Sequence, residues 1–190
     1  MKVPLLFMKV LLVSGTIIGN TASALLQIAK KKLEVLQEVD DIKIIDLKEL
    51  SLEFCDGRAI ADYNKDTRQL IEDFIAYDAY IIATPIFQNS IPGVLKNVFD
   101  LIPPTAMKYK PVSILANGGT YQHYLVVENQ LKPILDYFRS YVTPNYIYVN
   151  PEHLSDQGEI IDEDIQDRFN EMIEVFRDYL MMSKNRKLMK

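Results

Sequence analysis

The chain has 190 residues, 48% of them hydrophobic and 25% charged, which is the composition of a globular domain that buries a sizeable core. Its 21 basic and 26 acidic residues give a net charge of −5, which argues against nucleic-acid binding. Cys55 is the single cysteine, so an internal disulfide framework and a cysteine-based zinc site are excluded. No apolar run approaches the length of a transmembrane helix, and we expect a cytoplasmic protein that makes no contact with a membrane.

The N-terminal stretch MKVPLLFMKVLLVSG has the lysine-then-apolar order of a signal peptide. Lys9 interrupts the apolar run, however, and no small-residue cleavage site follows before the Ser-Gly turn. A second Met-Lys-Val begins at Met8, which favours a buried first strand. We therefore predict an extension at residues 1–7, a single domain at residues 8–182 and a solvated, frayed basic tail at residues 183–190.

Strand-like and helix-like patterns alternate along the domain. Short apolar runs rich in valine, isoleucine and leucine predict strands at residues 9–13, 42–47, 79–83, 111–116 and 146–149. Apolar residues spaced three and four apart predict helices at residues 21–37, 66–75, 92–101, 123–141 and 161–182. We expect residues 48–64 and 151–160 to be loops.

Local signals add detail to several of these helices. The apolar stripe of the first helix consists of Leu25, Ile28, Ala29, Leu33 and Leu36. The stripe of the last helix consists of Ile161, Ile165, Phe169, Met172, Ile173, Phe176 and Leu180. Ser90 can cap the helix that has Pro92 in its first turn. Pro133 predicts a kink or an irregular turn near Asn129.

Five strand–helix pairs in strict alternation indicate an α/β protein with a parallel, doubly wound sheet. Strands that are apolar without alternation indicate burial on both faces, and hence a three-layer sandwich. Right-handed crossovers leave few topologies, and five strands favour the order 2-1-3-4-5. Ligands of such sheets bind beyond the carboxyl ends of the strands, where the strand order reverses. We therefore expect a ligand against the loops that follow Val13, Ala83 and Ala116.

The loop after the first strand, SGTIIGNTAS, has the composition of an anion site. Exposed N–H groups and the dipole at the helix start favour an anion, and the candidate contacts are Ser14, Thr16, Asn20, Thr21 and Ser23. The loop has neither the lysine of a GxxxxGK[ST] P-loop nor a GxGxxG fingerprint. A neutral hydroxyl cradle suits a monophosphate better than a triphosphate with magnesium. A capped helix with a glycine turn and no ligand is the alternative.

The other two loops supply groups that could border a planar heterocycle. The loop after the third strand, in TPIFQNSIPGVLKNVFDLIP, places at the sheet edge Pro85, Ile86, Phe87, Gln88 and Asn89. The loop after the fourth strand, ANGGTYQH, offers Asn117, Gly118, Gly119 and Thr120, and its paired glycines permit close backbone approach. His123 is better explained as a helix N-terminal or surface residue, and we assign His153 no role.

Together the three loops resemble those of the NADPH-dependent FMN reductase family, which has a flavodoxin-like fold. TPIFQNSIPGVLKNVFDLIP is similar to the family's Thr-Pro-x-aromatic…Ser-x-Pro-Gly-x-Leu-Lys-Asn motif. LANGGTYQHYLVVENQLKPIL resembles more narrowly the reductases that supply reduced FMN to sulfonate monooxygenases. With those it shares Gly-Gly-Thr, a following histidine and Leu-Lys-Pro. The resemblance covers roughly residues 8–182.

The resemblance implies FMN and NADPH as ligands and hydride transfer from NADPH to FMN, chemistry that belongs to the cofactor and requires no catalytic residue. It places Thr16, Asn20, Thr21 and Ser23 near the FMN phosphate, residues 85–89 along the isoalloxazine and ribityl chain, and residues 117–120 on the other side of the ring. It further implies a homodimer or homotetramer packed partly through the helix from Ser90 and the helix after Gly119. A flavin-dependent monooxygenase is the partner it suggests.

Two positions depart from the family pattern. The family usually has an arginine where this chain has Ile18, so one charge-assisted phosphate contact, worth about 1.5–3 kcal/mol, is missing or comes from another cation. The sulfonate-linked reductases often carry a tyrosine, in a turn implicated in flavin exchange, where this chain has Asn129. The sequence leaves open whether flavin is a substrate or a bound prosthetic group, and whether the electron donor is NADPH or NADH. It also leaves three other functions open: a quinone, azo, nitro or chromate reductase, a flavodoxin-like electron carrier, and a regulatory fold without flavin.

Overall fold

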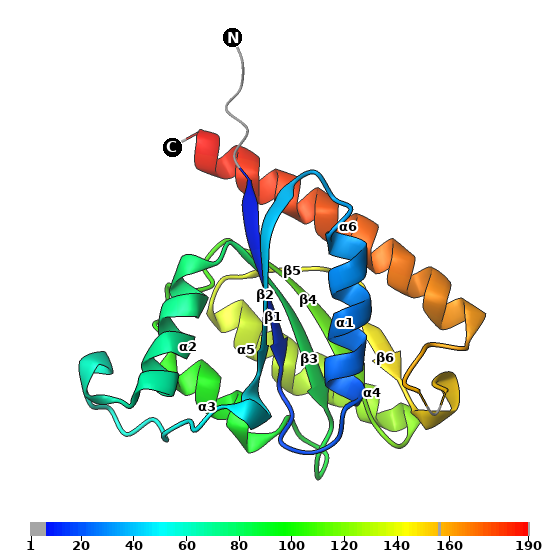
Figure 1. The fold of residues 1–190 in the computed structure, drawn as a ribbon, viewed down its shortest axis with the longest axis horizontal. Helices are drawn as coiled ribbons and strands as arrows, with labels where there is room; N and C mark the ends of the chain where they lie inside the picture. Colours follow the sequence, from blue (N-terminus) through cyan, green and yellow to red (C-terminus); the bar gives the residue numbers. More distant parts are fainter. Residues whose placement is uncertain (1–6, 156, 190) are drawn as a thin grey trace.

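A parallel β-sheet with helices on both faces forms the centre of the structure, a computed structural model that describes residues 7–155 and 157–189 (Figure 1). The strands are β1 (Met8–Ser14), β2 (Val39–Asp46), β3 (Ala79–Pro85), β4 (Pro111–Asn117), β5 (Tyr141–Val142) and β6 (Ile147–Val149). Their order, β2-β1-β3-β4-β5 with β6 also beside β4, confirms the predicted order and the flavodoxin-like class. β3 is buried along its whole length, as expected of a central strand that is covered on both faces.

The fifth position of the sheet is filled by two short strands, where the sequence predicted one strand at residues 146–149. β5 pairs with the start of β4, and β6 pairs with its end. Between them Pro144 has no N–H to give to a ladder, and the Thr143 hydroxyl hydrogen-bonds to Ser113 Oγ at 2.8 Å. β5 escaped prediction because a strand of two residues has no periodicity to detect.

The helices cover the two faces of the sheet in separate sets (Figure 1). α1 (Thr21–Leu33) and α6 (Glu163–Leu188) pack on one face. On the other face pack α2 (Lys65–Ala76), α3 (Gly93–Leu101), α4 (Tyr124–Val126), the π-helical segment η4 (Val127–Leu131) and α5 (Lys132–Tyr137). Short 3-10 turns complete the connections: η1 (Leu47–Glu49), η2 (Ile60–Asp62), η3 (Tyr121–His123) and η5 (Pro151–His153). None of the described helices combines the length and apolarity that a membrane crossing requires.

Three helical segments end at other residues than the sequence predicts. The helix predicted at residues 123–141 stops with α5 at Tyr137, because Arg139 takes a positive φ of +56° and Tyr141 already pairs with β4. α1 stops at Leu33 rather than at Gln37, because the chain must turn there to enter β2; Leu36 N donates to Leu33 O at 3.0 Å in that turn. Leu36 still packs partly against the core. α6 continues to Leu188, through residues that the sequence pattern assigned to the basic tail.

The start of α6 corrects the predicted stripe. Its N-cap is Asp162, whose Oδ1 accepts from Ile165 N at 2.9 Å. Ile161 therefore lies before the helix and is 58% exposed. The rest of the predicted stripe is buried: Ile165, Phe169, Met172, Ile173, Phe176 and Leu180.

The helix after η3 changes register where the sequence predicted an irregular turn, which confirms that prediction. Pro133 has no N–H and cannot give the α-helical bond to Asn129 O. The chain takes the wider i→i+5 register over η4, where Lys132 N donates to Val127 O. Asn129 Nδ2 donates to Leu125 O at 2.8 Å and so satisfies a carbonyl next to the irregular stretch.

The loop between β2 and α2 is tied to α3 by Asn97, a residue of the motif PGVLKN. Asn97 Oδ1 accepts from Cys55 N at 2.9 Å, and Asn97 Nδ2 donates to Glu53 O at 3.0 Å. The Asn97 side chain is buried, so water cannot replace either bond. This member of the motif is therefore structural.

Replacing Asn97 with alanine should lower the free energy of unfolding by about 2–4 kcal/mol, because both hydrogen bonds are lost and two backbone groups of the loop stay unpaired. The control is Lys96→Ala at the adjacent exposed position, where we expect a change within about 0.5 kcal/mol. Urea denaturation of the wild type and both variants measures the difference. Equal stability of the two variants would contradict the structural role of Asn97.

Candidate functional site

The loops that follow β1, β3, β4 and β6 meet at one edge of the sheet. Because the neighbouring strands are parallel, their carboxyl ends lie side by side. Backbone hydrogen bonds continue past the strand ends: Gly15 N to Ala83 O at 2.7 Å, Ile86 N to Asn117 O at 2.9 Å and Gly118 N to Val149 O at 3.1 Å. The three predicted loops are thus held next to one another.

Gly15 permits the first of these contacts. A Cβ at residue 15 would lie 2.8 Å from Leu95 Cδ2 and 3.2 Å from Ala83 O. The first distance is shorter than real Cβ contacts and the second is tight, so a side chain here would force Leu95 to shift. The glycine of the Ser-Gly turn therefore favours the close approach of this loop to β3 and α3.

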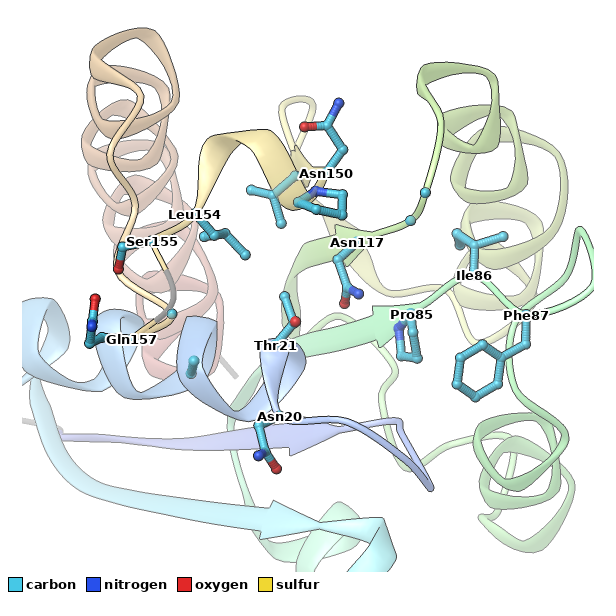
Figure 2. A pocket seen from close by; sticks show the side chains of 16 residues that line it. Asn20, Thr21, Pro85, Ile86, Phe87, Asn117, Asn150, Leu154, Ser155 and Gln157 are labelled. Atoms are coloured by element: carbon cyan, nitrogen blue, oxygen red, sulfur yellow. The ribbon is translucent and has the colours of Figure 1, made fainter.

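A cavity of about 610 Å³ opens between these loops and the start of α1 (Figure 2). Predicted residues from all three loops line it: Asn20, Thr21, Pro85, Ile86, Phe87, Asn117, Gly118 and Gly119. Figure 2 shows Thr21 and Asn117 directed into the same space from α1 and from the end of β4. The volume lies within the range of small-molecule sites, about 300–1,000 Å³.

The other predicted residues of the first loop hydrogen-bond within the protein. Ser23 Oγ donates to Asp46 Oδ2 at 2.5 Å, so Ser14 Oγ supplies the proton of its 3.2 Å bond to Ser23 Oγ. Thr16 is buried, and its Oγ1 donates to Ile18 O at 2.5 Å. These three hydroxyls build the loop, and their contact with a ligand stays a prediction.

The loop after β3 turns back on itself as a two-residue hairpin. Phe87 and Ser90 exchange backbone hydrogen bonds of 2.9 Å in both directions. Gln88 and Asn89 have φ angles of +48° and +59°, as in a type I′ turn, and such angles cost a non-glycine residue about 1–3 kcal/mol. Both side chains are exposed and lie outside the cavity lining. Their predicted contact with a ligand stays a prediction.

Ser90 does not cap α3, which corrects the prediction. The N-cap is Pro92, and no side chain makes a cap hydrogen bond there. Ser90 Oγ donates instead to Gln130 Oε1 at 2.7 Å, and Gln130 Nε2 donates to Asn89 O at 3.1 Å. Gln130 belongs to η4, so the π-helical segment holds the strained turn through a single carboxamide.

The loop after β4 is closed by Tyr148. Tyr148 Oη donates to Thr120 O at 2.6 Å. Burial raises the pKa of Tyr148, so the hydroxyl keeps the proton that this bond needs. A Cβ at residue 118 would overlap Tyr148 Oη. Glycine at this position leaves room for the tyrosine hydroxyl. Thr120 itself does not line the cavity, and its ligand contact stays a prediction.

One wall of the cavity comes from a segment that the sequence pattern assigned to a polar loop. Beside Ala24 of α1, this wall consists of Val149, Asn150, Pro151, Leu154, Ser155, Gln157 and Gly158. The segment follows β6 at the same sheet edge, and that position was the signal that could have identified it. His153, without an assigned role, is buried in this segment: its Nδ1 accepts from Asn150 N, and its Nε2 lies 3.3 Å from Tyr121 Oη.

The fold is flavodoxin-like, and the cavity lies at the switch point of its sheet, where ligands of this class bind. The NAD(P)H-dependent FAD/FMN reductase of Geobacillus thermodenitrificans is 47% identical over 162 residues, which cover 85% of this chain and 87% of that protein. The NADH-dependent FMN reductase SfnF of Pseudomonas fluorescens is 37% identical over 42% of each chain. FerB of Paracoccus denitrificans, a flavoenzyme NAD(P)H:(acceptor) oxidoreductase, shares the fold with a TM-score of 0.75 at 19% identity, covering 93% of this chain and 98% of FerB.

The family follows from a further match. The sequence profile of the NADPH-dependent FMN reductases fits residues 8–153, most of the chain. Together with the relative from Geobacillus, this match shows that the chain belongs to the NADPH-dependent FMN reductase family.

The polar groups of the cavity fit the FMN that this family implies. Asn117 Oδ1 is buried without a partner among the described residues, and flavin N–H and ribityl hydroxyl groups can donate to such an acceptor. α1 has neither a side-chain cap nor an acidic residue in its first turn, whereas Asn64 and Asp162 cap α2 and α6. The N–H groups at the start of α1 therefore suit a phosphate.

Gly118→Ala should lower the free energy of unfolding by about 1–3 kcal/mol, because the new methyl group overlaps Tyr148 Oη. Tyr148→Phe removes that oxygen and one hydrogen bond, at an expected cost of about 1 kcal/mol. In the double variant the overlap is gone, so the combined loss should be smaller than the sum of the single losses. Chemical denaturation of the four proteins measures this, and additive losses would refute the overlap.

Gln130→Met should loosen the turn at residues 87–90, because the side chain keeps its length but loses both hydrogen bonds. We expect faster amide hydrogen exchange at Phe87 and Ser90 and a stability lower by about 1–2 kcal/mol. Gln122→Met, at an exposed position in η3, is the matched control. If both variants exchange at the same rate at these two amides, Gln130 does not hold the turn.

Proposed function

We propose that this protein is an NAD(P)H-dependent FMN reductase whose flavin binds in the cavity between the loops after β1, β3 and β4. One observation carries the proposal: residues that the family resemblance assigns to FMN, from all three loops, line one cavity of about 610 Å³. Membership of the family and the relative from Geobacillus support FMN and NAD(P)H as the ligands.

In this proposal each loop binds its own part of the flavin. Asn20, Thr21 and the N–H groups at the start of α1 hold the phosphate. Residues 85–89 border the isoalloxazine and the ribityl chain, and residues 117–120 border the other side of the ring. The buried Asn117 Oδ1 accepts a hydrogen bond from the flavin.

FMN supplies the redox chemistry when bound, since a flavin accepts hydride from a reduced nicotinamide and passes electrons on. In this proposal the chain binds the flavin, orients its ring and shields it from water. Ile86 and Phe87 offer an apolar surface beside the ring, and Gly118 and Gly119 allow the backbone to approach it closely. We assign no side chain a proton-transfer role and therefore name no catalytic residue.

We further propose that the flavin is a substrate that leaves in its reduced form and serves a flavin-dependent monooxygenase. The resemblance of LANGGTYQHYLVVENQLKPIL to the sulfonate-linked reductases supports this, and η4 lies at the turn that this resemblance links to flavin exchange. A homodimer or homotetramer and a cytoplasmic location belong to the same proposal. So does the division into an extension at 1–7, a domain at 8–182 and a tail at 183–190.

A tightly bound flavin that reduces a quinone, azo or nitro compound is the second candidate, and Asn129 favours it. The resemblance places a tyrosine at this position in reductases that exchange their flavin. Asn129 instead turns back to Leu125 O within its own helix.

Oxidation of NADPH and NADH by the purified protein, with and without added FMN, separates the two candidates. We expect the rate of NAD(P)H oxidation to depend strictly on added FMN. The thermal stability should rise with the FMN concentration, because a ligand at a hundred times its Kd stabilises the native state by about 2.7 kcal/mol. Turnover of a quinone by the protein as isolated would establish the second candidate. If the protein as isolated reduces no quinone, azo or nitro compound, and added FMN changes neither the oxidation rate nor the stability, both candidates are wrong.

A further inference from the structure

The cavity has no positive charge where the family pattern places one. None of the described residues that line it is charged. Ile18 stands at the position of the family's arginine and is 68% exposed. A phosphate monoester carries about −1.5 to −2 charges at neutral pH, and the N–H groups of α1 supply only a fraction of one opposite charge. A cation from another part of the chain would offset the remainder.

Lys48 lies beside this place, although it comes from a different segment. β2 pairs with β1, so η1, which starts directly after β2, lies beside the loop after β1. Lys48 Nζ donates to Asn20 Oδ1 at 3.0 Å. Asn20 lines the cavity, and Figure 2 shows it at the start of α1. The Lys48 ammonium therefore contacts a residue of the cavity wall.

Asp46 holds Lys48 in this position. Lys48 Nζ lies 3.5 Å from Asp46 Oδ2. The carboxylate also accepts from Lys48 N at 3.3 Å and from Ser23 Oγ at 2.5 Å, so it is anchored to both η1 and α1. Without a neighbouring cation, the Asp46 carboxylate would repel a phosphate at the start of α1. The Lys48 ammonium offsets that repulsion.

The Lys48 ammonium can also bind a ligand directly. An ammonium has three N–H donors, and its contacts among the described residues are Asn20 and Asp46. One donor therefore remains. The side chain is 25% exposed, so the remaining donor is not enclosed by the protein.

We infer that Lys48 is the phosphate-binding cation of this protein, supplied by η1 in place of the arginine that Ile18 replaces. The inference rests on the proposed function, because it requires the FMN phosphate at the start of α1. The group that Lys48 recognises is a phosphate monoester. Lys48 therefore discriminates FMN from riboflavin, which has the same ring and ribityl chain but no phosphate.

The test is the dissociation constant of FMN and of riboflavin, measured by titration of flavin fluorescence. Lys48→Met should weaken FMN binding by about 10- to 100-fold, the range of one hydrogen bond to a charged group, and should leave riboflavin binding within about twofold. The affinity for FMN should also become less sensitive to salt. Lys48→Arg keeps the charge and should keep the preference for FMN.

Two further variants serve as controls. Lys65→Met removes the same charge at an exposed position at the start of α2 and should bind both flavins as the wild type does. Ile18→Arg added to Lys48→Met restores a cation at the family's position, and it should recover most of the lost FMN affinity.

Three results would overturn the inference. FMN affinity that is unchanged in Lys48→Met means that the ammonium does not reach the phosphate. An equal loss for FMN and riboflavin means that Lys48 acts on the shape of the loop, which a lower melting temperature without flavin would confirm. A wild-type protein that binds riboflavin as tightly as FMN has no phosphate contact at all. A wild type that binds neither flavin overturns the proposed function itself.

Discussion

The parallel backbone ladder is the interaction on which the rest of this structure depends. β1 lies between β2 and β3, and β4 lies between β3 and β6, all in the same direction, so their carboxyl ends reach one edge. The hydrogen bond from Gly15 N to Ala83 O extends this backbone pairing past the end of β1 into the loop. Loops far apart in the chain therefore form one cavity, because the ladder fixes their positions before any side chain takes part.

Side chains then hold each loop in shape. Ser23 bonds to Asp46 behind the first loop, Gln130 fastens the turn after β3, and Tyr148 closes the loop after β4. Asn117 Oδ1, by contrast, has no hydrogen-bond partner among the described residues and belongs to the cavity lining. In the proposed site, amides and backbone N–H groups therefore outnumber free hydroxyls as candidate binding groups.

Much of the fold was predictable because its signals are local. β1, β3 and β4 are short, mainly apolar runs, and the interruption at η4 follows from the missing N–H of Pro133. The prediction failed where a group with a local role in the sequence pattern bonds instead to a residue far away in the chain. Ser90 has the sequence of a cap, but its hydroxyl bonds to Gln130, 40 residues away. The two-residue β5 carried no signal, because its pairing with β4 alone makes it a strand.

By itself the sequence determined the order of the strands and the three loops at the switch point, because burial patterns, glycines and prolines act over a few residues. Only the tertiary structure decided which groups face the ligand. It turns Ser14, Thr16 and Ser23 inward and adds the segment after β6 to the cavity. It also brings Lys48 to Asn20, 28 residues away, through the pairing of β1 with β2. Such contacts depend on where two strands end relative to one another, and no pattern within either segment records that.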